Sequence, residues 1–289
     1  MSSPKQPESG WRKAFAPTPK NLVSFLITLI LVVGGIQYGI VGLEMMALTI
    51  AACMGTEALL SLFLLGRKPM LQSSYVSSMS LMHLVRPAAG LAWPFMAGAF
   101  LSIGSKYVLR WRGRHLWNPT SFGISLLVLL APAQVALLSH EYGNAMTGTA
   151  IIWVVGLIVA YRAKVLHISL AYVTSFIALA GLRTLIVPGT TFGAEVGPLT
   201  GPMYQLMTFF MMTDPRTTVS TKVGRIMTVI AVASVECLIR LGNDFDMAWA
   251  APFAPAPAIL ALFFVGPIAL AIDLARTTAP APKAVPAAA

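Results

Sequence analysis

The fold depends on two similar stretches, Tyr75-Val-Ser-Ser-Met-Ser-Leu-Met-His-Leu-Val-Arg86-Pro87 and Tyr204-Gln-Leu-Met-Thr-Phe-Phe-Met-Met-Thr-Asp214-Pro215. Each is short and methionine-rich, begins at a tyrosine and ends with a charged residue before a proline. Because proline has no amide hydrogen and disfavours the helical conformation of its predecessor, each stretch predicts a half-helix. Such breaks are tolerated in a membrane only inside protein or beside a wet cavity. The alternative is two unrelated apolar runs that end at prolines.

The composition is typical of a membrane protein. Of 289 residues, 57% are apolar and only 10% are charged, and the mean hydropathy is +0.77. An average soluble domain has roughly 25% charged residues. The composition therefore excludes a soluble enzyme, a disordered chain and a nucleic-acid-binding domain, although the net charge is +10. Cys53 and Cys237 lie in apolar stretches, too few for a disulfide framework or a four-cysteine metal site.

Ten apolar stretches are long or regular enough to be predicted membrane segments. They cover residues 21–40, 44–66, 75–87, 89–109, 119–138, 146–161, 165–187, 199–213, 222–241 and 248–274. The third and the eighth are too short to span as full helices. A polar cytoplasmic segment, 1–20, precedes them, and an Ala/Pro-rich tail, 276–289, is predicted to be disordered.

The positive charges test this arrangement. If the N-terminus lies in the cytoplasm and the chain alternates, all Lys and Arg residues except Arg86, Arg183 and Arg240 fall on the inner side. An error of one segment in the middle would reverse every later loop. The charge pattern thus favours a multi-pass protein of a bacterial-type inner membrane with both termini in the cytoplasm.

The ten segments divide into two membrane repeats, 21–145 and 146–275. With five segments each, the halves enter the membrane from opposite sides, as in many transporters. The expected fold class is therefore an all-α polytopic membrane protein of two inverted five-helix repeats with broken half-helices. This arrangement predicts a site near the midplane, where the half-helix ends meet.

Three acids are candidates for an ion or proton pathway. Glu57 and Glu236 lie inside predicted helices, where a charge normally faces the bundle interior and finds a partner. A relay and a paired acid that joins two helices are both open for Glu57. Arg240 lies four residues after Glu236, which favours a local pair there. The third acid, Asp214, ends the second half-helix.

Two polar stretches are candidate binding sites. In Thr213-Asp214-Pro215-Arg216-Thr217-Thr218 an acid and several donors adjoin apolar residues, although a plain solvated loop is the alternative. In Gly113-Arg-His-Leu-Trp-Asn-Pro119, Arg114 could anchor an anion and Asn118 could cap the next helix. Heme is not expected. A bis-histidine heme needs two facing helices at matched depth, and in the one pair that lies in or near helices, His83 and His167, the second lies near a cytoplasmic end. The methionines at 203, 207, 211 and 212 fit packing better than copper ligation.

These stretches resemble a known family. Three stretches of the chain occur in the same order as similar stretches of the NqrB and RnfD proteins. They are Gly113-Arg-His-Leu-Trp-Asn-Pro119, then Ala131-Pro-Ala-Gln134, and then Phe209-Phe-Met-Met-Thr-Asp-Pro215 followed by Thr217, Thr218, Lys222, Gly224 and Arg225. These are membrane flavin subunits of the sodium-translocating NADH:quinone reductase and of the Rnf complex. The resemblance covers about residues 45–275.

The resemblance implies a membrane subunit of an electron-transport complex, with other membrane or redox subunits as partners. Family members carry FMN on a threonine of a Ser-Gly-Ala-Thr motif after the fifth helix. The corresponding loop here, Ser139 to Thr149, lacks that motif, so covalent FMN is not expected. Noncovalent FMN or riboflavin, or loss of redox function, are both open. The candidate cofactor-binding residues are Arg114, Asn118, Thr213, Asp214 and Thr217.

Two other functions compete with electron transport. A small-solute or ion transporter or channel would use the same inverted repeat, because a fold does not fix a function. A structural anchor for a partner complex would need only the membrane segments.

Overall fold

The computed structural model describes residues 21, 24–25, 27–29, 31–32, 41–88, 90–137 and 146–277, and they are mostly helical. The predicted segment 1–20, most of the first membrane segment, part of the loop from Ser139 to Thr149, and nearly all of the tail 276–289 lie outside these residues.

The first group of helices comprises α3 (Leu43–Leu65), α4 (Leu71–Leu84), α5 (Trp93–Val108) and α6 (Pro119–Leu130). Helix α3 packs against α4 and α5, and α5 packs against α6. The α5–α6 contact is close because glycines face it. A Cβ atom on Gly123 would lie 2.2 Å from Ser102 Oγ, and one on Gly98 would lie 3.0 Å from a methyl group of Leu127.

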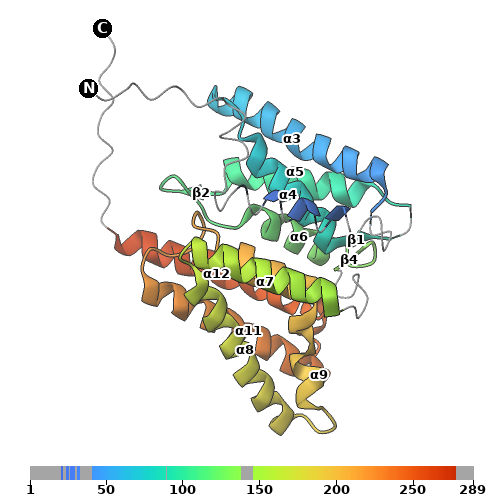
Figure 1. The fold of residues 1–289 in the computed structure, drawn as a ribbon, viewed down its shortest axis with the longest axis vertical. Coiled ribbons are helices and arrows are strands. Elements are labelled where there is room, and N and C mark those ends of the chain that lie inside the picture. Colours follow the sequence, from blue (N-terminus) through green and yellow to red (C-terminus); the bar gives the residue numbers. More distant parts are fainter. Residues whose placement is uncertain are drawn as a thin grey trace, which may run out of the picture.

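The second group contains three long helices, α8 (Leu166–Ile186), α11 (Lys222–Asp244) and α12 (Pro257–Arg276), and several shorter elements. The shorter elements are α7 (Met146–Arg162), α9 (Phe192–Val196), η1 (Gly197–Thr200), α10 (Pro202–Leu206), η2 (Met207–Met211) and η3 (Ala251–Phe253). Helix α11 packs against α8 and α12. Figure 1 shows α3 to α6 gathered together above α8, α11 and α12.

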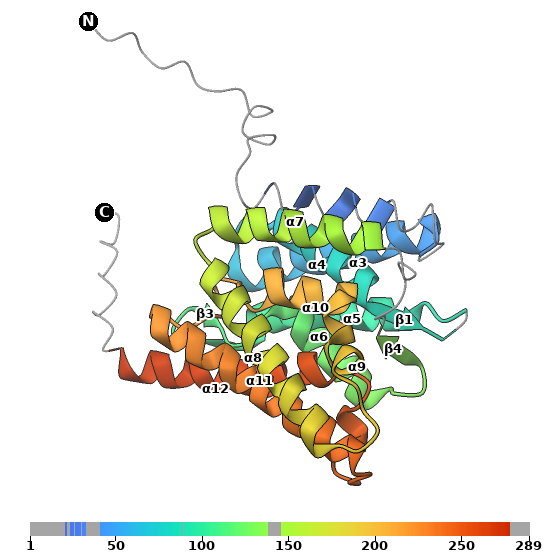
Figure 2. The ribbon, with the colours of Figure 1, turned by 60° about the horizontal axis from the view of Figure 1, so that its bottom comes forward.

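The two groups share one apolar core. Helix α6 packs on α12, and α4 packs on α10. Trp117, just before α6, donates from Nε1 to the carbonyl of Phe263 in α12 at 2.8 Å. Figure 2 shows α7 above α10, and these two helices of the second group pack together. Helices α10 and α12 of the second half therefore contact α4 and α6 of the first.

The first half-helix ends as predicted, before Pro87. Helix α4 stops at Leu84, and the chain continues as a short strand, β1 (Val85–Pro87). This strand pairs antiparallel with β4 (Val135–Leu137), and the N–H of Ala88 donates to the carbonyl of Gln134 at 2.8 Å. Since a helix break exposes backbone polar groups, this pairing supplies the hydrogen bonds that the lost turn would have made.

The second half-helix also ends before its proline. Helix α10 runs directly into η2, a π-helical turn, and the helical conformation ends near Met212, before Asp214 and Pro215. In η2 the N–H of Met212 donates to the carbonyl of Met207 at 2.9 Å. Such single π-turns occur often at functional sites. The turn widens the helix where Phe209 and Phe210 project.

Two predicted segments are less helical than their lengths suggested. In segment 119–138 the helix ends at Leu130, because Pro132 disfavours the helical conformation of Ala131. In segment 248–274 the α-helix begins only at Pro257, after the turns that contain Pro252 and Pro255. Proline position thus shortens both helices.

Three helices of the described residues are long and apolar enough to cross a membrane, namely α3, α8 and α12. Helices α5, α6 and α7 are shorter, and α11 carries several charges. Large apolar side chains of α3 point away from the protein, with Phe63 82% exposed and Leu59 58% exposed. Such a surface is unfavourable in water and suits contact with lipid.

A two-stranded hairpin joins α5 to α6. Strand β2 (Arg110–Trp111) pairs with β3 (Arg114–His115) through a turn at Arg112 and Gly113, whose φ angles are 48° and 80°. Two positive φ angles are the requirement of a type I′ hairpin turn, and glycine meets it at no steric cost. The turn reverses the chain, and so it places Arg114, His115 and Asn118 next to the second half.

Candidate functional site

A cavity of about 420 Å³ lies where the two groups of helices meet. Its walls come from α4, the start of α6, the end of α7, η2 and the loop after η2. The lining residues are Met70, Ser73, Val76, Ser77, Ser80, Lys106, His115, Asn118, Pro119, Thr120, Val159, Ala160, Ala163, Val165, Phe209, Phe210, Met211, Thr213, Asp214, Pro215 and Arg216. This volume falls within the usual range for small-molecule sites, about 300–1,000 Å³.

One wall of the cavity is a row of serines on α4. Ser73, Ser77 and Ser80 recur every three or four residues and so share one face of the helix. Ser77 Oγ donates to the carbonyl of Ser73 at 3.1 Å. The opposite wall, from η2 and α7, is apolar, with Phe209 and Phe210 as its aromatic residues. The cavity is therefore amphipathic.

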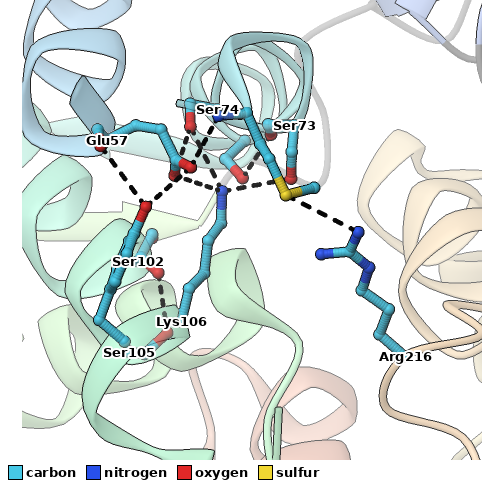
Figure 3. Close-up of polar contacts among 10 residues, drawn as sticks. Glu57, Ser73, Ser74, Ser102, Ser105, Lys106 and Arg216 are labelled. Atoms are coloured by element: carbon cyan, nitrogen blue, oxygen red, sulfur yellow. Dashed lines mark hydrogen bonds and ion pairs between the residues drawn. The ribbon is translucent and has the colours of Figure 1, made fainter. Parts of the chain in front are cut away.

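Lys106 brings a positive charge to this cavity. Its side chain is only 7% exposed and its ammonium lies between α3 and α4 (Figure 3). Lys106 Nζ is 3.5 Å from Glu57 Oε2, 3.3 Å from Ser73 Oγ and 3.4 Å from Ser74 Oγ. A buried charge is retained when it has such a partner. The ion pair joins α5 to α3 behind the serine row.

Glu57 has its own set of donors. Tyr107 donates to Oε1 at 2.9 Å, Ser74 donates to Oε2 at 2.9 Å, and the N–H of Met70 donates to Oε1 at 3.2 Å. Its carboxylate is buried and does not line the cavity. Glu57 is therefore linked to the cavity through two of its lining residues, Lys106 and Met70.

Asp214 and Asn118 meet across the two halves. Asn118 Nδ2 donates to Asp214 Oδ2 at 3.2 Å, and Asn118 Oδ1 accepts from the N–H of Ser121 at 3.1 Å, which caps α6. Asp214 Oδ1 accepts from the N–H of Arg216 at 3.0 Å. Asp214 follows the predicted membrane segment, and burial raises the pKa of its carboxyl, while these donors oppose that shift.

Arg114 and Thr217 support the same loop from outside the cavity. Arg114 donates to the carbonyls of Pro215, Arg216 and Thr218 at 2.9, 3.2 and 2.6 Å. Thr217 Oγ1 lies 3.4 Å from the carbonyl of Asp214. Of the five predicted cofactor-binding residues, Asn118, Thr213 and Asp214 line the cavity, and Arg114 and Thr217 do not.

His115 lines the cavity beside Lys106. Its Nδ1 is buried and has no hydrogen-bond partner in the described part of the chain. The pKa of His115 is lowered to about 4, chiefly by burial and next by the positive charges of Arg110 and Arg216. The imidazole is therefore uncharged at neutral pH.

Glu236 belongs to a separate cluster. It accepts from Tyr172 of α8 at 2.6 Å and from Tyr204 of α10 at 2.5 Å, and it pairs with Arg240 at 3.0 Å. Arg240 also contacts the Tyr204 hydroxyl. None of these four residues lines the large cavity. The three predicted pathway acids thus occupy different places, and the local pair of Glu236 with Arg240 is confirmed.

Several residues of the site were not singled out in the sequence. From the sequence, Lys106 is only a charge at a membrane edge, Arg216 is one donor of the polar stretch Thr213 to Thr218, and the serines of α4 have no assigned role. The spacing of Ser73, Ser77 and Ser80 in an apolar chain was a signal that could have been used. In contrast, nothing local predicts that Lys106 pairs with Glu57, because the two lie on different helices.

The described residues contain no group of three or more His, Cys, Asp or Glu side chains that could hold a metal ion. No family model matches the chain, and no curated protein matches it either.

Proposed function

We propose that the chain is an integral membrane subunit of an electron-transport complex, built from two inverted five-segment halves in a bacterial-type inner membrane with both termini in the cytoplasm. The apolar helices α3, α8 and α12 support a membrane location. The halves would be 21–145 and 146–275.

Recurrent packing supports the repeat. In the first half α3 packs on α5, and α5 on α6; in the second half α8 packs on α11, and α11 on α12. The short α4 lies between α3 and α5 in order, as α10 with η2 lies between α8 and α11. In each half, therefore, the second segment packs on the fourth and the fourth packs on the fifth. The third segment is short in both halves.

The buried ion pairs recur in the same place. Glu57 and Lys106 lie where α3, α4 and α5 meet, and Ser74 of α4 bonds to the acid. Glu236 and Arg240 lie where α8, α10 and α11 meet, and Tyr204 of α10 bonds to the acid. Among the described residues, each half thus has a three-helix junction at which a carboxylate, a cation and hydroxyl donors meet.

The cavity between the halves is the observation that carries the redox proposal. A noncovalent flavin, FMN or riboflavin, needs an apolar slot for its rings and polar groups for its ring carbonyls. Phe209 and Phe210 supply the first, and Ser80 and Thr120 supply hydroxyls that lack a partner in the described residues. These residues fit the group, and Asn118 and Thr213 would complete the wall.

When bound, a flavin would supply the electron-accepting chemistry, which side chains cannot provide. The chain's own residues would bind and orient the group: α4 with its hydroxyls, η2 with its aromatic rings, and the loop held by Arg114. The apolar wall from α7 would exclude water. Electrons would pass to and from partner subunits, which the proposal requires.

Visible absorbance tests this proposal. The full chain, expressed in flavin-replete cells and purified in mild detergent, should carry flavin absorbance that is lost on denaturation and extraction. Ser80→Leu, which fills the cavity, should lower the flavin content, whereas Ser234→Leu on α11, away from the cavity, should not. A colourless wild-type protein that also fails to bind added flavin would contradict the proposal.

A solute transporter is the second candidate, because interrupted helices that meet at a cavity beside buried ion pairs are common in transporters. Flux of ions or small polar solutes into proteoliposomes that contain the chain alone would favour it. No flux, together with co-purifying redox subunits, would favour the first proposal.

A further inference from the structure

We propose that the edge of the cavity between Lys106 and Arg216 binds the phosphate group of an organic ligand whose apolar body fills the cavity. The inference rests on the proposed function in one respect, that this cavity is a ligand site, and it adds the charge class of the ligand. Lys106 belongs to the first half and Arg216 to the second, so the bound phosphate would join the halves.

The ammonium of Lys106 is loosely held. Its three contacts, with Glu57, Ser73 and Ser74, are 3.3 to 3.5 Å long. Charge-assisted N–H···O bonds are normally about 2.7–2.9 Å. The ammonium lines the cavity and is buried there, with room to form a shorter bond to an oxyanion.

Glu57 can lose part of this ion pair without becoming unsatisfied. Its carboxylate keeps the hydroxyl of Tyr107 at 2.9 Å, the hydroxyl of Ser74 at 2.9 Å and the N–H of Met70 at 3.2 Å. Sharing Lys106 with a ligand therefore leaves no buried carboxylate without donors. Glu57 has three other donors, whereas Lys106 has only long contacts. Lys106, rather than Glu57, is therefore the group available to a ligand.

Arg216 supplies the second charge. Its side chain is exposed, and its guanidinium lies 4.0 Å from the sulfur of Met70 (Figure 3). In the described part of the chain no carboxylate pairs with it. Arg114 holds the carbonyl of Arg216 at 3.2 Å and so fixes the backbone from which the guanidinium reaches the cavity.

Two hydroxyls within the cavity point independently to a ligand. Ser80 is 9% exposed and Thr120 is 5% exposed, both line the cavity, and neither has a hydrogen-bond partner among the described residues. Neither hydroxyl oxygen is sealed off inside the protein, so each can bond a ligand that enters the cavity. A ligand with polar atoms on its apolar body would satisfy both.

The other charged groups at the cavity decide where the phosphate lies. Asp214 lines the wall and repels an anion, but its two oxygens already accept from Arg216 N and Asn118 Nδ2. His115 is uncharged at neutral pH. The positive charges are thus Lys106 and Arg216, on the side of the cavity that is formed by Met70 and Ser73.

Two ligand pairs that differ only by a phosphate test the inference. The first pair is FMN and riboflavin, and the second is naphthyl phosphate and naphthol, all followed by fluorescence with the full chain in nanodiscs. We expect the phosphorylated member of each pair to bind about tenfold tighter, as one charged hydrogen bond predicts. Arg216→Gln should remove that preference, while Arg67→Gln, at an exposed arginine outside the cavity, should keep it.

A second variant covers Lys106 without leaving a buried charge alone. The double variant Glu57→Gln with Lys106→Met removes both charges, and it should also reduce the phosphate preference. Equal affinities within both pairs, or a preference that Arg216→Gln leaves intact, would overturn the inference. If naphthyl phosphate keeps its preference and neither flavin binds, the flavin proposal fails and the phosphate site stands.

Discussion

Asn118 Nδ2 donates to Asp214 Oδ2 at 3.2 Å, and this bond joins the start of α6 to the loop that ends the second half-helix. The same amide caps α6 through its oxygen, which accepts from Ser121 N at 3.1 Å. One side chain therefore fixes a helix start in the first half and orients a carboxylate in the second. The cavity between the halves depends on both contacts.

The two roles of Asn118 can be separated by substitution. Asn118→Ala should lose the cap and the bond to Asp214, and the cap alone costs about 1 kcal/mol of stability. Asn118→Ser should keep a capping oxygen and lose the amide donor. Thermal unfolding of the two variants in detergent should therefore differ, with Asn118→Ser the more stable. Both variants should bind the ligands of the cavity more weakly than the wild-type chain.

Thr221→Ala is the control for this prediction. Thr221 caps α11 by accepting from Gly224 N at 3.1 Å and does not line the cavity. It should lose stability by a similar amount and keep ligand affinity. If Thr221→Ala and Asn118→Ser weaken ligand binding equally, the bond between Asn118 and Asp214 has no special role.

The ion pair of Glu57 and Lys106 should respond asymmetrically to mutation. Glu57→Gln leaves a buried ammonium with long contacts only, and removal of one partner from a buried pair costs about 3–5 kcal/mol. Lys106→Met leaves a carboxylate that keeps three donors, so its cost should be smaller. The double variant should be more stable than the sum of the single effects predicts.

Chemical unfolding of the four proteins in one detergent measures this double-mutant cycle. Equal losses for the two single variants, with additive effects in the double variant, would mean that the charges do not interact as described.

The α5–α6 contact should not tolerate a side chain at Gly123. A Cβ atom there would meet Ser102 Oγ at 2.2 Å and the carbonyl of Gly98 at 3.0 Å, so the helices would have to separate. Gly123→Leu should therefore cost about 1–3 kcal/mol or more through overpacking. The melting temperature should fall, whereas Gly104→Leu, whose Cβ would meet no atom within 4 Å, should change it little.

His115 should make stability depend on pH in a defined window. Its pKa is lowered from 6.5 to about 4 in the folded chain, so the unfolded chain binds a proton first as the pH falls. This contribution to stability is complete above pH 6.5 and is lost as the pH falls toward 4. His115→Gln should therefore show a flatter decline in melting temperature between pH 6.5 and 4. Parallel profiles for the two proteins would contradict the burial of a neutral imidazole.

The local features of the fold could be predicted from the sequence. Pro87 and Pro215 indicated where the two short helices end, and Asn118 before Pro119 indicated a helix cap. Glu236 and Arg240, four residues apart, indicated a local pair. In each case the deciding groups lie within a few residues of one another, so spacing alone carries the prediction.

The remaining features depend on contacts between distant segments. The pairing of β1 with β4 links Val85 to Leu137, and no local pattern selects that partner. Lys106 could be interpreted only as a membrane-edge charge until α5 was packed on α3. Likewise, Arg114 had the sequence context of an anion anchor, but its three bonds are to carbonyls of the loop 215–218, whose position the sequence does not give.

The side of the membrane on which Lys164 lies tests the central claim most directly, that the chain forms two oppositely oriented five-segment halves. In a chain whose Cys53 and Cys237 are replaced by alanine, Lys164→Cys and Asp246→Cys are each exposed to a membrane-impermeant thiol reagent on intact cells. The inverted repeat predicts that the cysteine at 246 reacts and that the one at 164 reacts only after the cells are opened. Reaction at 164 in intact cells would contradict the arrangement and the cavity roles that depend on it.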